Sequence, residues 1–214
     1  MDLYLDSADI TALRPLLRTG LFAGVTTNPL ILRSAGVRLS DVPTLVRELV
    51  ELTDQVFVQA PGTSDVEQIV GQARELRALS DRVTVKVVAT RAGLTAARRL
   101  ADEGVPVLVT AVYGVRQALL AAAAGADWVA PYLGRISESG RDGVAEVARI
   151  GAALGASPTR LLVASVRDLP TVEALAVART DAATIGVDLA TASFEDDLVH
   201  AAARQFDQAV DELG

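Results

Sequence analysis

The most constraining feature of this sequence is a regular alternation of short β-branched segments with longer segments of helical periodicity. Eight segments have the pattern of strands: 3–6, 24–27, 56–59, 83–88, 105–112, 128–131, 160–165 and 182–187. Amphipathic segments separate them, among them 63–79, 91–102, 115–124, 143–154 and 169–178. Strands that alternate with helices pair in parallel, and eight such units fit a chain of 214 residues. The pattern therefore predicts an α/β fold, a single (β/α)8 TIM barrel.

An open doubly wound sheet is the alternative with the same alternation. Such a sheet usually carries a glycine-rich phosphate loop after its first strand, but the segment from Leu5 to Asp9 contains no glycine. No linker or low-complexity segment interrupts the chain, so we expect one domain over residues 1–214. A long helix, predicted over 194–213, ends the chain and could close the barrel or pack on a neighbouring subunit.

The composition excludes several classes of function. Half of the residues are apolar, yet no apolar run is long and uninterrupted enough to span a bilayer, and no basic segment precedes an apolar run at the amino terminus, so we expect a cytoplasmic protein with no membrane partner. With no cysteine and one histidine, His200, a zinc or iron site of thiolates and imidazoles cannot be assembled in one chain, and we expect neither metal nor cofactor. His200 lies among apolar residues and is predicted to be a packing or surface residue. The net charge of −7 and the scattered arginines argue against nucleic acid and favour small-molecule partners.

One basic residue differs from all the others. The chain has 20 lysines and arginines together, and the only lysine is Lys86, within Val83-Thr84-Val85-Lys86-Val87-Val88. Guanidinium stays protonated, whereas an ammonium in an apolar site can lose its proton and attack a carbonyl. Period-two alternation puts Lys86 on the face of Thr84 and Val88, which in a barrel can be the interior. Burial there would lower the pKa of Lys86, as a Schiff-base amine requires; the alternative is a lysine that extends from an edge strand to solvent.

Other polar residues stand at or near the carboxyl ends of the predicted strands, where a barrel gathers its active site. They are Asp6, Thr26, Asn28, Gln59, Thr110, Tyr132, Arg135 and Ser165. Singly, these signals have structural explanations: Asp6 could cap a helix, and the turn from Thr26 to Pro29 could start the next one. The barrel interior could satisfy the polar groups of Gln59, Thr110 and Tyr132. Their convergence on Lys86 favours a catalytic site.

The loops after the sixth and seventh predicted strands offer groups suited to a phosphate. Arg135 and Arg167 could supply guanidinium forks, and Ser165 a hydroxyl. Surface ion pairs are the alternative explanation for the two arginines.

Along nearly its whole length the sequence resembles the transaldolase family, in particular its small branch of fructose-6-phosphate aldolases and short transaldolases. The segments that carry the resemblance are Leu3-Tyr4-Leu5-Asp6, Ala23-Gly24-Val25-Thr26-Thr27-Asn28-Pro29, Val83-Thr84-Val85-Lys86-Val87, Thr110-Ala111-Val112-Tyr113, Ala124-Gly125-Ala126, Ala130-Pro131-Tyr132-Leu133-Gly134-Arg135-Ile136 and Ala164-Ser165. Their order and spacing match the family as well.

The resemblance implies a role for each candidate residue. Lys86 would form an iminium with a ketose phosphate and Asp6 would assist proton transfer at the reacting hydroxyl. Thr26 and Asn28 would hold donor hydroxyls, and Gln59, Thr110 and Tyr132 would fix the water that carries protons. Arg135 and Ser165 would bind the phosphate, with Arg167 as a helper. The bond between the third and fourth carbons would break, leaving an enamine of dihydroxyacetone that an aldehyde or water then takes.

One comparison within the resembling family bears on whether transfer or cleavage dominates. The aldolase side typically has a glutamine and a tyrosine at the water site, as Gln59 and Tyr132 here, with Leu108 beside them, whereas the segments 133–136 and 165–167 resemble the phosphate end of transaldolases. A second departure is the segment Thr184-Ile185-Gly186-Val187, where the family commonly has a proline after the strand, and the segment before the last helix is also shortened. These departures imply a different size of acceptor. Related small members form ring-like assemblies through the carboxyl-terminal helix, which implies a homo-oligomer, a pentamer or decamer.

Two other classes of function remain open from the residues alone. A sugar-phosphate isomerase on the same barrel would need a carboxylate base at the catalytic end, and only Asp6 could serve, because no glutamate stands at a predicted strand end. A non-catalytic binding module would not need the single lysine.

Overall fold

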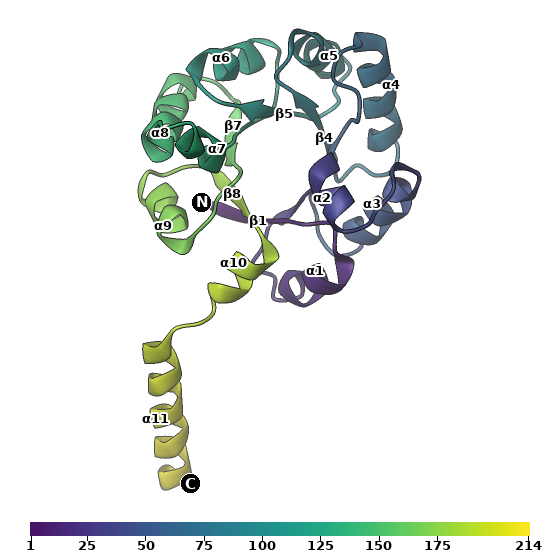
Figure 1. Ribbon diagram of the computed structural model, residues 1–214. Coiled ribbons are helices and arrows are strands. Elements are labelled where there is room, and N and C mark those ends of the chain that lie inside the picture. Colours follow the sequence, from purple (N-terminus) through teal and green to yellow (C-terminus); the bar gives the residue numbers. More distant parts are fainter.

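The computed structural model describes residues 1–214 and has eight parallel strands in a closed barrel whose neighbours follow chain order. The strands lie inside a ring of helices (Figure 1). They are β1 (Asp2–Asp6), β2 (Gly24–Thr26), β3 (Val56–Gln59), β4 (Val83–Val88), β5 (Val107–Val112), β6 (Trp128–Pro131), β7 (Arg160–Val163) and β8 (Ala182–Ile185). β8 pairs with β1 and closes the sheet. The predicted TIM barrel is confirmed, and the open sheet is wrong.

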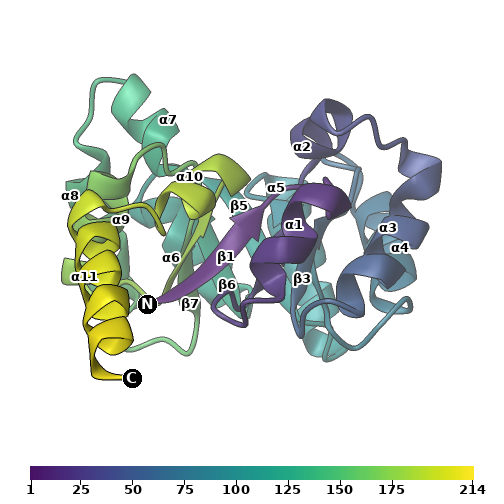
Figure 2. The ribbon, with the colours of Figure 1, turned by 90° about the horizontal axis from the view of Figure 1, so that it is seen from below.

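Helices follow the strands, and several begin at a side chain that accepts hydrogen bonds from the first turn. They are α1 (Ile10–Leu17), α2 (Pro29–Ser34), α3 (Val42–Val50), α4 (Val66–Arg77), α5 (Arg91–Asp102), α6 (Val115–Ala123), α7 (Leu133–Glu138), α8 (Gly143–Leu154), α9 (Leu169–Val177), α10 (Val187–Ala192) and α11 (Asp197–Leu213), with a 3-10 turn at Leu39–Asp41. Asp9, Asp65, Asp142 and Asp168 cap α1, α4, α8 and α9, which satisfies amide groups that no helical carbonyl reaches. The two short helices α2 and α7 rise at the same end of the barrel (Figure 2).

The core has two layers because alternate residues of each strand face opposite ways. Between strands and helices lies a cluster of 45 buried residues that includes Val83, Val85 and Val87 of β4. The inside of the barrel holds a second cluster: Tyr4, Phe57, Leu108, Trp128, Ala130, Leu162 and Ala182. The rings of Tyr4 and Phe57 meet edge to face at 5.4 Å, and those of Phe57 and Trp128 at 5.6 Å. These aromatic rings fill the interior below the polar side chains.

Strand ends differ from the predicted ones where the backbone stops pairing. β5 begins at Val107 instead of 105, after Pro106, which has no N–H to donate. β7 ends at Val163 instead of 165, since Ser165 has φ of 61°, in the left-handed region that a strand cannot contain. β2 and β8 also end earlier, and Val187 begins α10.

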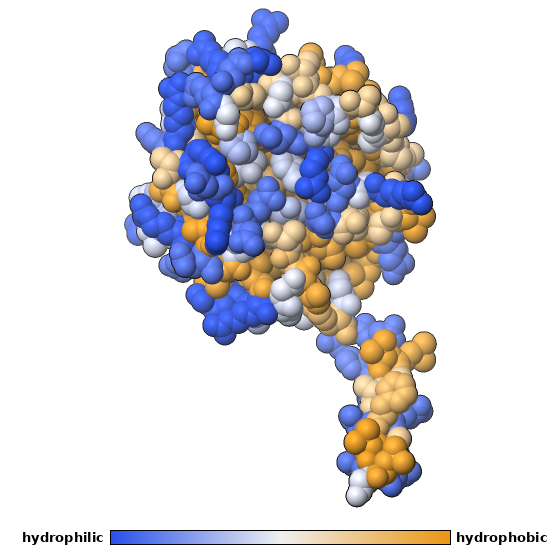
Figure 3. Space-filling model, turned by 180° about the vertical axis from the view of Figure 1, so that it is seen from behind, coloured by the Kyte–Doolittle hydropathy of each residue, from blue (hydrophilic) through white to orange (hydrophobic).

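The last helix, α11, projects away from the barrel (Figure 1). It begins at Asp197, because Asp196 caps it, instead of at 194 as predicted. None of its residues is buried, and Leu198, Phe206, Val210 and Leu213 are exposed. Figure 3 shows apolar side chains along this helix. No helix of the chain has the length and apolar character that crossing a membrane would require.

Candidate active site

A cavity of about 190 Å³ opens at the carboxyl ends of the strands, between α2 and α7. Its wall consists of Asp6, Asn28, Leu30, Ile31, Ser34, Lys86, Tyr132, Arg135, Ala164, Ser165 and Arg167. Seven of the ten residues predicted from the sequence are in that wall. The cavity joins groups from strands far apart in the chain, which is how a barrel builds an active site.

Lys86 lies inside the barrel, where β4 turns it away from the outward valines. The residue is 4% exposed, and its Nζ donates a hydrogen bond to the carbonyl oxygen of Thr27 at 2.8 Å. Burial lowers the pKa of Lys86, and the charge of Asp6 opposes that effect. An amine in this setting can be neutral and keep a lone pair for a carbonyl carbon.

Asp6 ends β1 and faces the same cavity. Thr26 Oγ1 donates to Asp6 Oδ1 at 2.5 Å. Burial raises the pKa of Asp6, while Lys86, the Thr26 hydroxyl and Arg167 act in the lowering direction. A carboxyl group with opposed influences on its pKa is suited to taking up and returning a proton.

Asn28 caps a helix with its side-chain oxygen, and its side-chain amino group remains available to a ligand. Its Oδ1 accepts from the backbone amides of Leu30 and Ile31 at 2.9 and 3.1 Å, so it caps α2, and Pro29 at the first helical position helps to start that helix. Because the oxygen is engaged, the Nδ2 amino group is the part of Asn28 that can donate to a ligand in the cavity.

Tyr132 and Thr110 form a hydroxyl pair on one side of the cavity. Thr110 Oγ1 donates to the Tyr132 hydroxyl at 3.1 Å, and burial raises the pKa of Tyr132. Thr110 is 1% exposed and lies behind Tyr132, outside the wall itself. The pair can pass a proton to or from a bound water.

Ser165 and two arginines form the part of the cavity next to Tyr132, which forms a β-bridge with Ala164. Ser165 Oγ is buried with no hydrogen-bond partner, which is rare for a hydroxyl and indicates a ligand site. The backbone amide of Gly134 donates to the Ser165 carbonyl oxygen at 2.9 Å, and Arg167 lies 3.6 Å from Glu138, both half exposed. Together with Arg135, these groups suit an anion.

Gln59 is the candidate that lies apart. It is in register with Lys86 across β3 and β4, but it lines a separate groove of about 430 Å³ between α2, α3 and α4. Gln59 ends β3, as predicted, and it is outside the wall of the cavity that holds Lys86.

Other residues belong to the site although the sequence did not single them out. Leu30 and Ile31 of α2 form an apolar part of the cavity wall, beside the hydroxyl-bearing Ser34. Thr184 of β8 contacts Thr26, with 2.7 Å between their Oγ1 atoms. Period-two alternation of β8 could have indicated Thr184 as an inward residue, but its partner comes from a strand 158 positions away.

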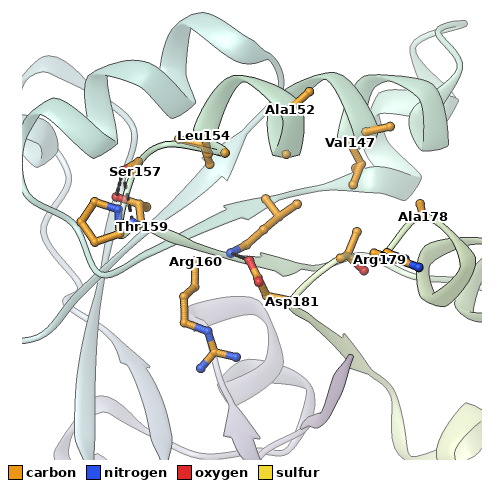
Figure 4. Close-up of a pocket in the computed structure, with 15 residues that line it drawn as sticks. Val147, Ala152, Leu154, Ser157, Thr159, Arg160, Ala178, Arg179 and Asp181 are labelled. Atoms are coloured by element: carbon orange, nitrogen blue, oxygen red, sulfur yellow. Dashed lines mark hydrogen bonds between the residues drawn. The ribbon is translucent and has the colours of Figure 1, made fainter.

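A second groove, of about 450 Å³, lies at the opposite end of the barrel from the cavity that holds Lys86 (Figure 4). Thr159 and Arg160 line it where β7 begins, and Asp181 lines it just before β8. Their polar groups are engaged: Asp181 accepts from the Leu161 amide at 2.7 Å, and Arg160 pairs with Asp2 at 3.0 Å. Nowhere in the chain do three His, Cys, Asp or Glu side chains gather into a possible metal site.

Comparison with known proteins identifies the sequence relatives of this chain. The sequence model of the family described as Transaldolase/Fructose-6-phosphate aldolase matches residues 3–214. A protein of Phenylobacterium zucineum named "Probable transaldolase" is 36% identical over 208 residues, which cover 96% of this chain and 94% of that protein. Another of that name, from Methanococcus maripaludis, is 34% identical over 198 residues, which cover 91% of this chain and 87% of that protein.

A likeness to solved structures concerns the fold alone. The orotidine 5'-monophosphate decarboxylase of Metallosphaera sedula superposes with a TM-score of 0.60 at 13% identity, covering 87% of this chain and 88% of that one. Many chemistries use this barrel, so the shared fold carries no statement about the reaction.

Proposed function

The chain belongs to the transaldolase/fructose-6-phosphate aldolase family, and on that premise we propose that it transfers or releases a dihydroxyacetone unit of a ketose phosphate through an iminium on Lys86. One observation carries the proposal: the only lysine of the chain is buried at the carboxyl end of the barrel, in a setting that lowers its pKa. A neutral amine there is a nucleophile for a ketone.

The first step joins Lys86 Nζ to the carbonyl carbon of the ketose. The carbonyl oxygen takes up protons and leaves as water, and the nitrogen becomes a protonated imine. Tyr132 and Thr110, whose hydroxyls are 3.1 Å apart, hold the water that carries these protons. The hydrogen bond from Nζ to the Thr27 carbonyl fixes the direction of the amine before it reacts.

The second step breaks the bond between the third and fourth carbons. Asp6 takes the proton of the fourth-carbon hydroxyl, the electron pair of the broken bond moves to the iminium nitrogen, and an aldehyde leaves. An enamine of dihydroxyacetone stays on Lys86. Thr26 keeps the Asp6 carboxylate in place, and the Asn28 amino group donates a hydrogen bond to a hydroxyl group of the ketose.

The third step decides between transfer and cleavage. An acceptor aldehyde takes the enamine in a transaldol reaction, whereas protonation and hydrolysis release dihydroxyacetone. Ser165, Arg135 and Arg167 bind the phosphate of the sugar, which would give the buried Ser165 hydroxyl its missing partner. The role proposed for Gln59, beside Tyr132 at the water site, is supported by its register with Lys86 across β3 and β4.

Borohydride trapping tests the proposal directly. Wild-type protein treated with fructose 6-phosphate and borohydride should gain the mass of the reduced adduct, and the Lys86→Arg variant, which keeps the positive charge, should gain none. Products with and without an aldose phosphate then separate transaldolase from aldolase. Equal labelling of the two proteins, or no labelling of the wild type by any ketose phosphate, would reject Lys86 as the nucleophile.

We also propose that the chain works as a homo-oligomer, a pentamer or decamer as in related small members, held through α11. An isolated helix with an exposed row of apolar side chains gains stability by packing on another surface. Phe206 and Val210 lie on that row, at 70% and 66% exposure, and Gln208 lies on the opposite side of the helix. Phe206→Asp should lower the mass measured by light scattering, and Gln208→Asp should not; a monomeric wild type would contradict the proposal.

A further inference from the structure

Two threonines meet beneath the carboxyl group of Asp6, one from each strand that flanks β1. Thr26 on β2 is in register with Asp6, and Thr184 on β8 is in register with Tyr4. Their hydroxyl oxygens are 2.7 Å apart, and Thr26 Oγ1 is also 2.5 Å from Asp6 Oδ1. The two threonines are 0% and 2% exposed. Thr184, Thr26 and Asp6 therefore form a buried chain of hydrogen bonds.

Counting protons fixes the direction of this chain. Each hydroxyl has one proton, and among the protein groups Thr184 has one partner, Thr26. When Asp6 is ionised, Thr184 donates to Thr26 and Thr26 donates to Asp6, so both protons are used. When Asp6 is protonated on Oδ1, three protons share two contacts and one buried O–H is left without an acceptor; when it is protonated on Oδ2, Oδ1 becomes a neutral oxygen and a weaker acceptor for the Thr26 hydroxyl. An unmade hydrogen bond in a buried site is costly, so the chain favours the ionised carboxylate.

We propose that Thr184 is a positioning residue that fixes the Thr26 hydroxyl toward Asp6 and so keeps the buried carboxyl group of Asp6 ionised. Without the Thr184 hydroxyl, Thr26 would lose the donor that polarises its own O–H group, and its hydrogen bond to the ionised Asp6 carboxylate would weaken. The catalytic consequence rests on the proposed function, in which Asp6 must begin the cleavage step as a base.

Other groups act on Asp6 and must be separated from this chain. Lys86 on β4 and Arg167 after β7 favour the charged carboxylate, and burial opposes it. Tyr132, after β6, also feels the charge of Asp6. None of them is hydrogen-bonded to Thr184, so a substitution of Thr184 changes the row of hydroxyl groups and leaves these charges in place.

Three variants isolate the effect. Thr184→Val keeps the shape of the side chain and removes the hydroxyl, whereas Thr184→Ser retains a hydroxyl. Thr84→Val makes the same Thr-to-Val change at a barrel residue that is not part of the Thr184–Thr26–Asp6 hydrogen-bond chain. Thr84 is 4% exposed, and its one hydrogen bond, from Gln55, is long at 3.5 Å. The protonation of Asp6 is followed by infrared spectroscopy of carbon-13 aspartate-labelled protein, and the Asp6 band is the one that Asp6→Asn lacks.

Thr184→Val should raise the protonation midpoint of Asp6 by about 0.4–1 pH unit, the equivalent of one net hydrogen bond. Thr184→Ser should return it to the wild-type value and Thr84→Val should leave it there. The acid limb of kcat/KM should move with the infrared midpoint. An unchanged midpoint in Thr184→Val, or an equal change in Thr84→Val, would overturn the proposal. The infrared titration needs no turnover, so it stands even if borohydride trapping fails and the proposed function is rejected.

Discussion

Replacement of Gly134 by alanine tests whether the side of the cavity proposed to bind phosphate depends on close backbone approach. Gly134 lies in the first turn of α7, and its amide donates to the carbonyl oxygen of Ser165. A Cβ at Gly134 would lie 2.5 Å from that oxygen, 2.9 Å from Ser165 Oγ and 3.1 Å from Arg167 Nε. Real Cβ atoms do not approach an oxygen so closely, so α7 or the 164–167 segment must move by at least about 0.5 Å.

Two opposing effects decide the stability of Gly134→Ala. Alanine in a helix is favoured over glycine by about 1 kcal/mol. The clash costs about 1–3 kcal/mol, because Ser165 already has φ of 61° and cannot relax freely. Gly71 in α4 supplies the control, since a Cβ there meets nothing within 4 Å. The variant at Gly134 should therefore be less stable than Gly71→Ala by about 1–3 kcal/mol, or roughly 2–12 °C in Tm for a chain of this length.

Activity measurements should distinguish an effect at the phosphate end of the substrate from an effect at its carbonyl end. A shift of the Ser165 hydroxyl and Arg167 by half an ångström to one ångström should lower kcat/KM for phosphorylated substrates roughly tenfold to hundredfold. Borohydride trapping of unphosphorylated dihydroxyacetone on Lys86 should keep its wild-type rate. If Gly134→Ala is stabilised as much as Gly71→Ala and discriminates substrates as the wild type does, the close approach is irrelevant to the site.

Three further perturbations follow from the described contacts. Gly24→Ala would bring a Cβ to 2.2 Å from the backbone oxygen of Gln55, and urea unfolding should show a loss of about 3 kcal/mol or more, unlike a neutral surface change. Burial raises the pKa of Tyr4 to about 12, so the stability that its neutral form contributes is intact below pH 10 and is lost as the pH rises to 12; the difference from Tyr4→Phe should shrink by up to about 2.7 kcal/mol over that range, and a constant difference would contradict this. Asp196→Ala removes the cap of α11 and should lower its helical circular dichroism by an amount consistent with about 1 kcal/mol, whereas Asp196→Asn should retain most of it.

The barrel itself could be predicted because its signals are local. Strands β3 and β4 were predicted with their observed bounds, as were helices α5 and α8. Apolar periodicity and capping residues act within a few positions, so the sequence is enough to predict such elements. The ends of β5 and β7 differed because pairing stops where Pro106 lacks a donor and where Ser165 takes a positive φ. A propensity pattern does not encode that second event, since serine is not a residue that marks the left-handed region.

The site could be predicted in part, for a similar reason. Rare residues and strand ends indicated Lys86 and Asp6, because the parallel barrel brings all carboxyl ends together whatever their distance in the chain. Thr184 was missed because its partner is set by the two strands that flank β1. The position of Gln59 in the wall of a separate groove was also beyond the sequence, since the other residues of that wall come from α2, α3, α4 and the segments beside them.

The single lysine and the aromatic interior of the barrel act together to lower the pKa of Lys86. An arginine at position 86 could not give up its proton, and a lysine in contact with water would keep its own. Tyr4, Phe57 and Trp128 fill the barrel below the polar layer, so Lys86 meets solvent only through the cavity between α2 and α7. The lowered pKa of Lys86 is thus maintained by residues that never touch a substrate. Loosening that interior should make the amine easier to protonate at neutral pH and slow adduct formation while every residue of the cavity wall stays in place.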